Sequence, residues 1–313
     1  MSLEYNILWV DDDIENLLDP DISTLKNDIE NYLEKLGYIP SIQTFEDINS
    51  AKSKLFQTNF DLILSDYNMD GGNGDVLIKE IRGGNIYTEV LFYTGQAQQQ
   101  IENIAKSLFA DRVSFHNLKS DDRNNKEFKE KIIWLIDQTL KKLQELNAVR
   151  GLVMAETSRL DRIIEDIIIN YFNSDDGNKE TLKEYILNKI KESLKSNFSG
   201  DDLKISSKTE LEIVKSRIFD AYKKSQTLQK LIALKNIDGN FKHEDYNKNV
   251  IKTRNELAHA KSLIKEGKEV LLIEKGEGIE EKEFRQEDIV EIRKNILKYD
   301  KILKELKKKC KPK

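Results

Sequence analysis

The first 120 residues alternate five short apolar runs with segments of helical length, and this alternation limits the possible folds more than any other feature. The runs cover residues 5–10, 41–45, 61–65, 89–93 and 112–115. Strands joined by helix-length connections imply right-handed crossovers and parallel pairing. We therefore predict a doubly wound α/β domain with a five-stranded parallel sheet and helices on both faces.

The rest of the chain favours helices. Prolines occur only at Pro20, Pro40 and Pro312, so residues 41–311 contain none of these helix breakers. Helical periodicity runs through residues 125–172, 179–195, 209–235, 245–263 and 286–309, and residues 269–284 are typical of a β-hairpin. We expect an α/β domain over residues 1–124, a rigid linking helix over 125–147, and an all-α domain with a small β-hairpin over 148–313.

Composition excludes several classes of protein. Cys310 is the only cysteine, which excludes an internal disulfide, and the three histidines nearly exclude a multi-histidine metal site. No apolar run approaches the roughly 18 residues that a membrane span needs, and no leader pattern precedes the first strand. We expect a cytoplasmic protein that does not associate with membranes.

Charge is unevenly distributed along the chain. Residues 1–120 carry a net charge of −11 and the remainder +6, against −5 for the whole chain. The asymmetry suggests different partners for the two halves, with the basic half better suited to polyanions. A lysine-rich, solvated helical surface gives the same sum, so charge alone does not favour nucleic acid.

Three carboxylates are expected to meet at one edge of the predicted sheet. Asp11 and Asp12 follow the first strand, and Asp66 ends the third. Ligands of open parallel sheets bind at the carboxyl ends of the strands, near the switch in strand order. Clustered carboxylates need a hard cation, which suits Mg²⁺, and such a cation can neutralise a phosphoryl group that passes to a carboxylate.

The spacing around these residues resembles the receiver domain of two-component response regulators. Further matches are Asn68, Met69 and Gly74 after the third strand, and Thr94 at the end of the fourth. The resemblance implies that Asp66 accepts a phosphoryl group from a sensor histidine kinase or phosphotransfer protein. It implies the following Mg²⁺ ligands: Asp11, Asp12, Asp66 and the backbone carbonyl of Asn68. It also assigns a switch role to Thr94.

Two positions depart from the receiver pattern. Asp70 stands where the family usually has proline, and Gly71 and Gly72 follow it. The lysine that normally closes the fifth strand is displaced. We expect Lys119 to take that role if the strand end bulges, with His116 as the alternative.

One stretch of the helical half carries reactive groups, namely Arg254, Asn255 and His259. Histidine exchanges protons near neutral pH, and arginine holds phosphate without deprotonating. These groups would suffice for metal-independent RNA cleavage by the 2′-hydroxyl. The stretch resembles the Arg-x4-His motif of the HEPN family of helical domains, many of which are ribonucleases. Glu156 and Asp161 could line the same groove, although we expect both at the surface.

Helical geometry separates the arginine from the histidine. A five-residue offset rotates about 140° around a helix, so Arg254 and His259 lie on different faces, whereas Asn255 and His259 share one. Two copies meeting across a two-fold axis could supply both groups, as the HEPN resemblance implies, and we expect a homodimer. One apolar run offers a surface for that dimer, although packing inside the chain could use the same residues: Ile163, Ile164, Ile167 and Ile168.

Two functions compete on this evidence. The first is a phosphorylation-controlled endoribonuclease that acts on single-stranded RNA. The second is a phospho-switched dimer that docks a partner protein and cleaves nothing. A transcription factor is less favoured, because no helix-turn-helix with a short glycine-containing turn stands out.

Overall fold

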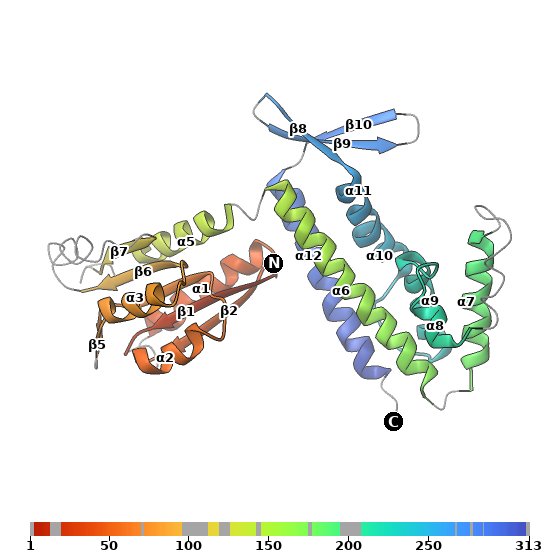
Figure 1. Ribbon diagram of the computed structural model, residues 1–313, viewed down its shortest axis with the longest axis horizontal. Helices are drawn as coiled ribbons and strands as arrows, with labels where there is room; N and C mark the ends of the chain where they lie inside the picture. The colour runs from red at the N-terminus through yellow and green to blue at the C-terminus, as the bar shows by residue number, and fades with distance from the viewer. Residues whose placement is uncertain are drawn as a thin grey trace. The chain divides into compact units, whose positions relative to one another are not determined.

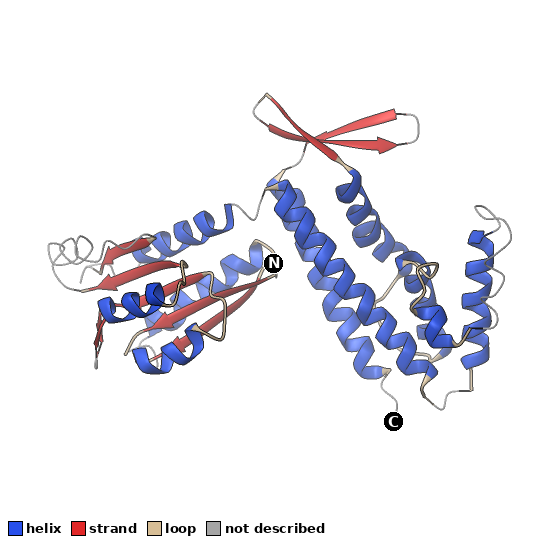
Figure 2. Ribbon diagram, in the orientation of Figure 1, coloured by secondary structure: helices blue, strands red, loops and turns tan. Residues whose placement is uncertain are grey.

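The computed structural model describes residues 3–12, 20–69, 72–95, 112–118, 126–141, 145–174, 177–194, 208–266, 268–275, 278–283 and 285–310. The chain divides into two compact units, Ser2–Ala148 and Val149–Lys313. We call them the N-terminal unit and the helical unit. Their elements are labelled in Figure 1 and coloured by type in Figure 2.

The N-terminal unit is built on one parallel sheet. Its described elements are β1 (Glu4–Val10), α1 (Pro20–Lys35), β2 (Ile39–Phe45), α2 (Ile48–Leu55), β3 (Leu62–Asp66), β4 (Asn68–Met69), β5 (Gly72–Asn73), α3 (Gly74–Gly83), β6 (Glu89–Thr94), β7 (Val113–Asn117) and α5 (Lys126–Lys141). The strand order is β2-β1-β3-β6-β7, and every neighbouring pair is parallel. This confirms the predicted five-stranded parallel sheet. The winding reverses between β1 and β3, so ligands are expected at the carboxyl ends of those strands.

Helices cover both faces of this sheet. Ile29 of α1 and Ile132 of α5 are buried with Trp9 on one face. Leu55 of α2 and Ile78 of α3 are buried with Val10 on the other. Trp9 and Val10 are neighbours on β1, and the pleat directs their side chains to opposite faces. β1 is therefore buried on both sides, as its continuous apolar sequence requires.

Helix α5 is part of the N-terminal unit, which differs from the linking helix expected over residues 125–147. Its apolar face lies in the core with α1 and the sheet, through Phe128, Ile132, Leu135, Ile136 and Leu140. Polar contacts with α1 add to this packing, because Lys129 Nζ lies 2.8 Å from Asp28 Oδ2. The helical spacing of the apolar residues predicts this helix. They recur at that spacing because they pack against the sheet. The helix ends at Lys141, and the next helix begins at Leu146.

The helical unit is dominated by two long helices that lie side by side, α6 and α12 (Figure 1). Its described elements are α6 (Leu146–Phe172), α7 (Lys179–Leu194), α8 (Glu210–Val214), α9 (Ala221–Leu234), α10 (His243–Tyr246), the π-helix η3 (Asn247–Lys252), α11 (Thr253–His259), β8 (Lys261–Lys265), β9 (Lys268–Lys275), β10 (Gly278–Glu283) and α12 (Gln286–Lys309). Salt bridges join the long pair, from Arg159 to Asp300 at 2.5 Å and from Lys307 to Asp166 at 2.6 Å. The unit is largely helical, as predicted.

Two predicted helices of this unit are shorter than expected. The helix predicted over residues 209–235 is interrupted between α8 and α9, where the Asp220 side chain caps α9 by accepting from the Lys223 backbone N–H. The helix predicted over 245–263 ends at His259, because Ala260 is extended and Arg150 of α6 donates to its carbonyl. The chain then forms β8, so the predicted hairpin becomes a three-stranded antiparallel sheet with the order β10-β9-β8.

The isoleucines of α6 serve the core of their own unit. Ile164, Ile167 and Ile168 are completely buried within the chain. These three residues therefore pack inside their own unit and leave no dimer surface, whereas Ile163 is half-buried. None of the helices in the described ranges is long and apolar enough to cross a membrane.

Candidate functional site

The carboxyl ends of β1 and β3 bring three aspartates together. Val10 and Ser65 are partners in the parallel register, so Asp11 and Asp66, which follow them, emerge at the same end of the sheet. One carboxylate oxygen from each of Asp11, Asp12 and Asp66 lies within 4.8 Å of the others. Asp11 is buried, Asp66 is half-buried and Asp12 is exposed. The group is therefore anchored in the core and open to solvent on one side.

This donor set fits a divalent cation. Three carboxylates at such distances repel one another, and a bound cation offsets that repulsion. Oxygen ligands suit Mg²⁺, which binds through a few carboxylates and keeps several waters. Asn68 begins β4 two residues after Asp66, while its side chain lies outside the described residues. The backbone carbonyl assigned to Asn68 from the sequence thus lies two residues beyond the end of β3.

The expected switch residues lie at the ends of β6 and β7. Thr94 is buried and ends β6, next to the strand that carries Asp66. Its carbonyl accepts from the Leu118 backbone N–H at 2.9 Å. Lys119 lies outside the described residues. His116, the alternative, pairs in register with Tyr93, and its ring stacks on Phe128 of α5 at 5.2 Å between centroids.

Tyr93 is a member of the site that sequence reasoning missed. Its hydroxyl donates a hydrogen bond to Asp11 Oδ2 and accepts one from Trp9 Nε1 at 2.7 Å. Burial raises the pKa of the Tyr93 hydroxyl well above its ordinary value, and the charge of Asp11 raises it further. Tyr93 directly precedes the predicted site residue Thr94, but its local sequence pattern does not predict the bond to Asp11.

Comparison with known proteins agrees with this geometry. The family model of the response regulator receiver domain matches residues 17–115. The N-terminal unit contains a response regulator receiver domain. Receiver domains belong to two-component systems, so its partner is a histidine kinase or a phosphotransfer protein.

Several solved structures are similar to this receiver domain. The chemotaxis protein CheY4 of Vibrio cholerae is 22% identical and covers 44% of this chain and 99% of its own, with a TM-score of 0.32. A CheY-like receiver domain protein from Methanospirillum hungatei is 20% identical and covers 44% of this chain and 98% of its own, with a TM-score of 0.33. The response regulator TrrA from Thermotoga maritima, in complex with Mg²⁺ and BeF, is 24% identical and covers 42% of this chain and 98% of its own, with a TM-score of 0.30.

Outside the receiver domain, the structure separates the reactive groups predicted in the helical unit. The Arg254 guanidinium contacts Asp161 Oδ2 of α6 at 3.3 Å and donates to Asn255 Oδ1 at 3.1 and 3.2 Å. His259 is exposed at the last position of α11. Within the described ranges no hydrogen bond joins Arg254 to His259. Both residues belong to α11, where the five-residue offset directs their side chains to different faces of the helix.

The expectation that Glu156 and Asp161 are surface residues is wrong. Glu156 is buried, and its Oε2 accepts from Arg159 Nε at 2.9 Å. Asp161 is half-buried against Arg254, and burial raises the pKa of its carboxyl, although Arg254 lowers it. The two acids are five residues apart and lie on different faces of α6, and the sequence of α6 alone does not reveal that both are shielded from solvent.

The turn before Arg254 is irregular. Residues Asn247–Lys252 form a π-helix, a rare conformation that is often found at functional sites. The preceding residue, Tyr246, is completely buried, and among the described residues its hydroxyl has no hydrogen-bond partner. Burial and the nearby Asp161 raise the pKa of this hydroxyl. The π-helix thus connects a buried polar tyrosine to the segment that carries Arg254.

Proposed function

We propose that the protein is a cytoplasmic response regulator whose Asp66 accepts a phosphoryl group and thereby controls the helical unit. The observation that carries this proposal is the group of three carboxylates, Asp11, Asp12 and Asp66, whose oxygens lie within 4.8 Å at the carboxyl ends of β1 and β3. The donor is a sensor histidine kinase or a phosphotransfer protein, in keeping with the receiver domain.

The transfer is a nucleophilic displacement at phosphorus. An Asp66 carboxylate oxygen forms a bond to phosphorus while the bond from phosphorus to the donor imidazole nitrogen breaks, and the imidazole leaves with the bonding electrons. Mg²⁺ held by Asp11, Asp12, Asp66 and the Asn68 carbonyl supplies, when bound, neutralising charge for the phosphoryl oxygens.

Two further residues respond to the new phosphate. The Thr94 hydroxyl, at the end of the neighbouring strand β6, donates to a phosphoryl oxygen. Lys119 supplies a positive charge, with His116 as the alternative. A phosphoryl group shifts the conformational equilibrium only if these contacts are stronger in one conformation than in the other.

Intact-mass analysis after incubation with acetyl phosphate and Mg²⁺ tests this proposal. The wild-type protein should gain one phosphoryl group, and Asp66→Asn should gain none. Asp61→Asn is a matched control, because Asp61 immediately precedes β3, at the end opposite Asp66, and accepts from the Asn6 backbone N–H. A wild-type protein that never gains mass, or an Asp66→Asn variant that still does, would contradict the assignment.

A second candidate function concerns the helical unit itself, as a metal-independent endoribonuclease of the HEPN type. Arg254 would stabilise charge on the cleaved phosphate, His259 would transfer the proton, and Asn255 would orient the arginine. The observations that favour it are the exposure of His259 at the end of α11 and the hydrogen bond by which Asn255 orients Arg254 on the same helix. Because Arg254 and His259 lie apart in one chain, this function requires a homodimer.

The alternative is a dimeric interaction module without catalysis. It is favoured by the ion pair with Asp161, which occupies Arg254 within its own chain. Incubation of the full-length protein with single-stranded RNA, with and without acetyl phosphate, separates the two. Cleavage that is lost in His259→Ala but retained in Lys252→Ala, an exposed cation nearby, supports the nuclease. Intact RNA in both conditions, with a dimeric mass by light scattering, supports the interaction module.

A further inference from the structure

Tyr93 makes a contact that the proposed phosphoryl transfer does not use. An indole N–H can only donate, so Trp9 Nε1 donates to the Tyr93 oxygen at 2.7 Å, and the Tyr93 hydroxyl donates in turn to Asp11. Tyr93 is 3% exposed and Trp9 is 1% exposed. The hydroxyl is therefore fixed from both sides inside the core, and its position relative to Asp11 is set by the sheet.

Asp11 is consequently held at its backbone and at its side chain. Its backbone N–H donates to the Phe45 carbonyl at the end of β2, at 3.0 Å. Its carboxylate accepts from Tyr93, which stands on β6, two strands away from β1 in the sheet order. Three strands of the sheet thus determine where one carboxylate lies.

We propose that Tyr93 is a positioning residue for the divalent cation, and that it holds the Asp11 carboxylate toward Asp12 and Asp66. The inference rests on the proposed function, because it requires a cation at that cluster. An ionised carboxylate offers about four acceptor sites, so the bond from Tyr93 leaves capacity for a metal ion. Hydrogen bonds to a metal-ligating carboxylate orient it toward the metal ion, and their loss typically lowers metal affinity 10–100-fold.

Metal binding to the full-length protein tests this role directly. Mn²⁺ serves as the probe, with the free ion measured by electron paramagnetic resonance and Mg²⁺ used as a competitor. Tyr93→Phe removes one oxygen atom and keeps the ring, and we expect it to weaken Mn²⁺ binding by about tenfold or more. Phosphorylation of Asp66 should then require correspondingly more Mg²⁺.

Matched variants separate positioning from general loss of stability. Tyr5→Phe removes a hydroxyl from the same core, where Tyr5 is 1% exposed and bonds Thr139 Oγ1 at 2.5 Å. It should bind Mn²⁺ as the wild type does. Trp9→Phe removes the other partner of Tyr93 and keeps the bond to Asp11, so it should also keep its Mn²⁺ affinity.

A double variant covers the case in which Tyr93→Phe alone does not fold. Trp9→Phe with Tyr93→Phe leaves no buried indole N–H without a partner, and replacing both partners by apolar groups can be nearly neutral for stability. The double variant should show the same loss of Mn²⁺ affinity as Tyr93→Phe. A double variant that binds Mn²⁺ as tightly as Trp9→Phe would overturn the proposal.

The outcomes distinguish this inference from the proposed function. Tyr93→Phe that binds Mn²⁺ equally well or more tightly, while Asp66 still accepts a phosphoryl group, overturns the positioning role alone. A wild-type protein that binds no Mn²⁺ overturns the metal site as well. In that case the separate acetyl phosphate experiment should show no gain of a phosphoryl group.

Discussion

The ring of Tyr93 lies 4.7 Å from the ring of Phe128, centroid to centroid, with the two planes inclined at 57°. Phe128 belongs to α5, so the last helix of the receiver domain contacts the tyrosine whose hydroxyl holds Asp11. His116 of β7 stacks on the same phenylalanine. A displacement of α5 is therefore expected to move the side chains beside the carboxylates. A rearrangement of the carboxylates is expected in turn to move α5.

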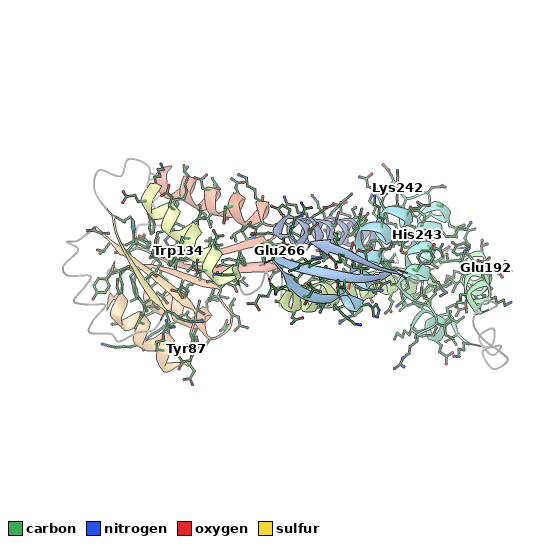
Figure 3. All side chains as sticks on the ribbon, turned by 90° about the horizontal axis from the view of Figure 1, so that it is seen from above. Tyr87, Trp134, Glu192, Lys242, His243 and Glu266 are labelled. Atoms are coloured by element: carbon green, nitrogen blue, oxygen red, sulfur yellow. The ribbon has the colours of Figure 1, made fainter. Side chains whose placement is uncertain are left out.

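We expect Phe128→Ala to lower the free energy of unfolding of the receiver domain by about 3–5 kcal/mol, because it leaves a cavity between α5 and the sheet. Urea denaturation measures this loss. Trp134→Ala is the control, since Trp134 lies on the same helix (Figure 3) and is 49% exposed. It contacts Lys131 through its ring, and its removal should cost no more than about 1 kcal/mol. Equal losses in the two variants would contradict the assignment of α5 to the core.

Addition of Mg²⁺ should stabilise the receiver domain. At a concentration of one hundred times its dissociation constant, a ligand that binds only the folded state adds about 2.7 kcal/mol. Asp11→Asn should lose most of this gain. With the metal removed by a chelator, Asp66→Asn should unfold at higher urea than the wild type, because it removes one of three repelling charges. A variant that is less stable than the wild type under chelation would show that repulsion at the cluster is negligible.

The pH dependence of the free energy of unfolding should reveal the titration of the Asp161 carboxyl. Burial raises the pKa of its carboxyl above 3.8, so the folded state holds this proton more tightly than the unfolded state. Its stabilising contribution is therefore complete below about pH 4 and is lost as the pH rises through the folded pKa. The stability of Asp161→Asn relative to the wild type should rise over that range, as urea titrations at several pH values would measure. Asp166→Asn, an exposed position on α6, is the control.

Thr94 should couple phosphorylation of Asp66 to the function of the helical unit, without being needed for phosphorylation itself. We expect Thr94→Ala to leave Asp66 open to acetyl phosphate, while any effect of phosphorylation on RNA cleavage or partner binding is lost. Thr94→Ser keeps the hydroxyl and should keep the coupling. If Thr94→Ala still responds to phosphorylation, the signal leaves the acceptor site by another route.

The parts of the fold that short-range patterns encode were predicted well from the sequence. The apolar runs of β1 and β3 end at the acids they were expected to present, because a strand buried on both faces must be apolar until it reaches solvent. The long helix α12 also follows its apolar periodicity and begins and ends where that pattern does.

Long-range contacts account for what the sequence did not reveal. The bond from Tyr93 to Asp11 joins residues 82 positions apart, and nothing in either local pattern announces it. The burial of Glu156 and the packing of α5 against the sheet depend in the same way on which element packs against an amphipathic helix. The end of α11 at His259 is associated with Arg150, which binds the Ala260 carbonyl from a distant helix. Periodicity predicts that a face is buried, but it does not name the neighbour.

The small sheet of the helical unit has a further consequence for self-association. β8 pairs only with β9 among the described strands, and Ile264 on β8 is 71% exposed. An outer strand can pair with the backbone of another molecule. Two copies of β8 aligned antiparallel about Leu263 would set Lys261 of each copy opposite Lys265 of the other, and like charges in directly opposed positions destabilise such pairing. The lysines at its two ends therefore disfavour the growth of this sheet by addition of identical strands, whereas a strand with acidic ends would meet complementary charge beside Ile264.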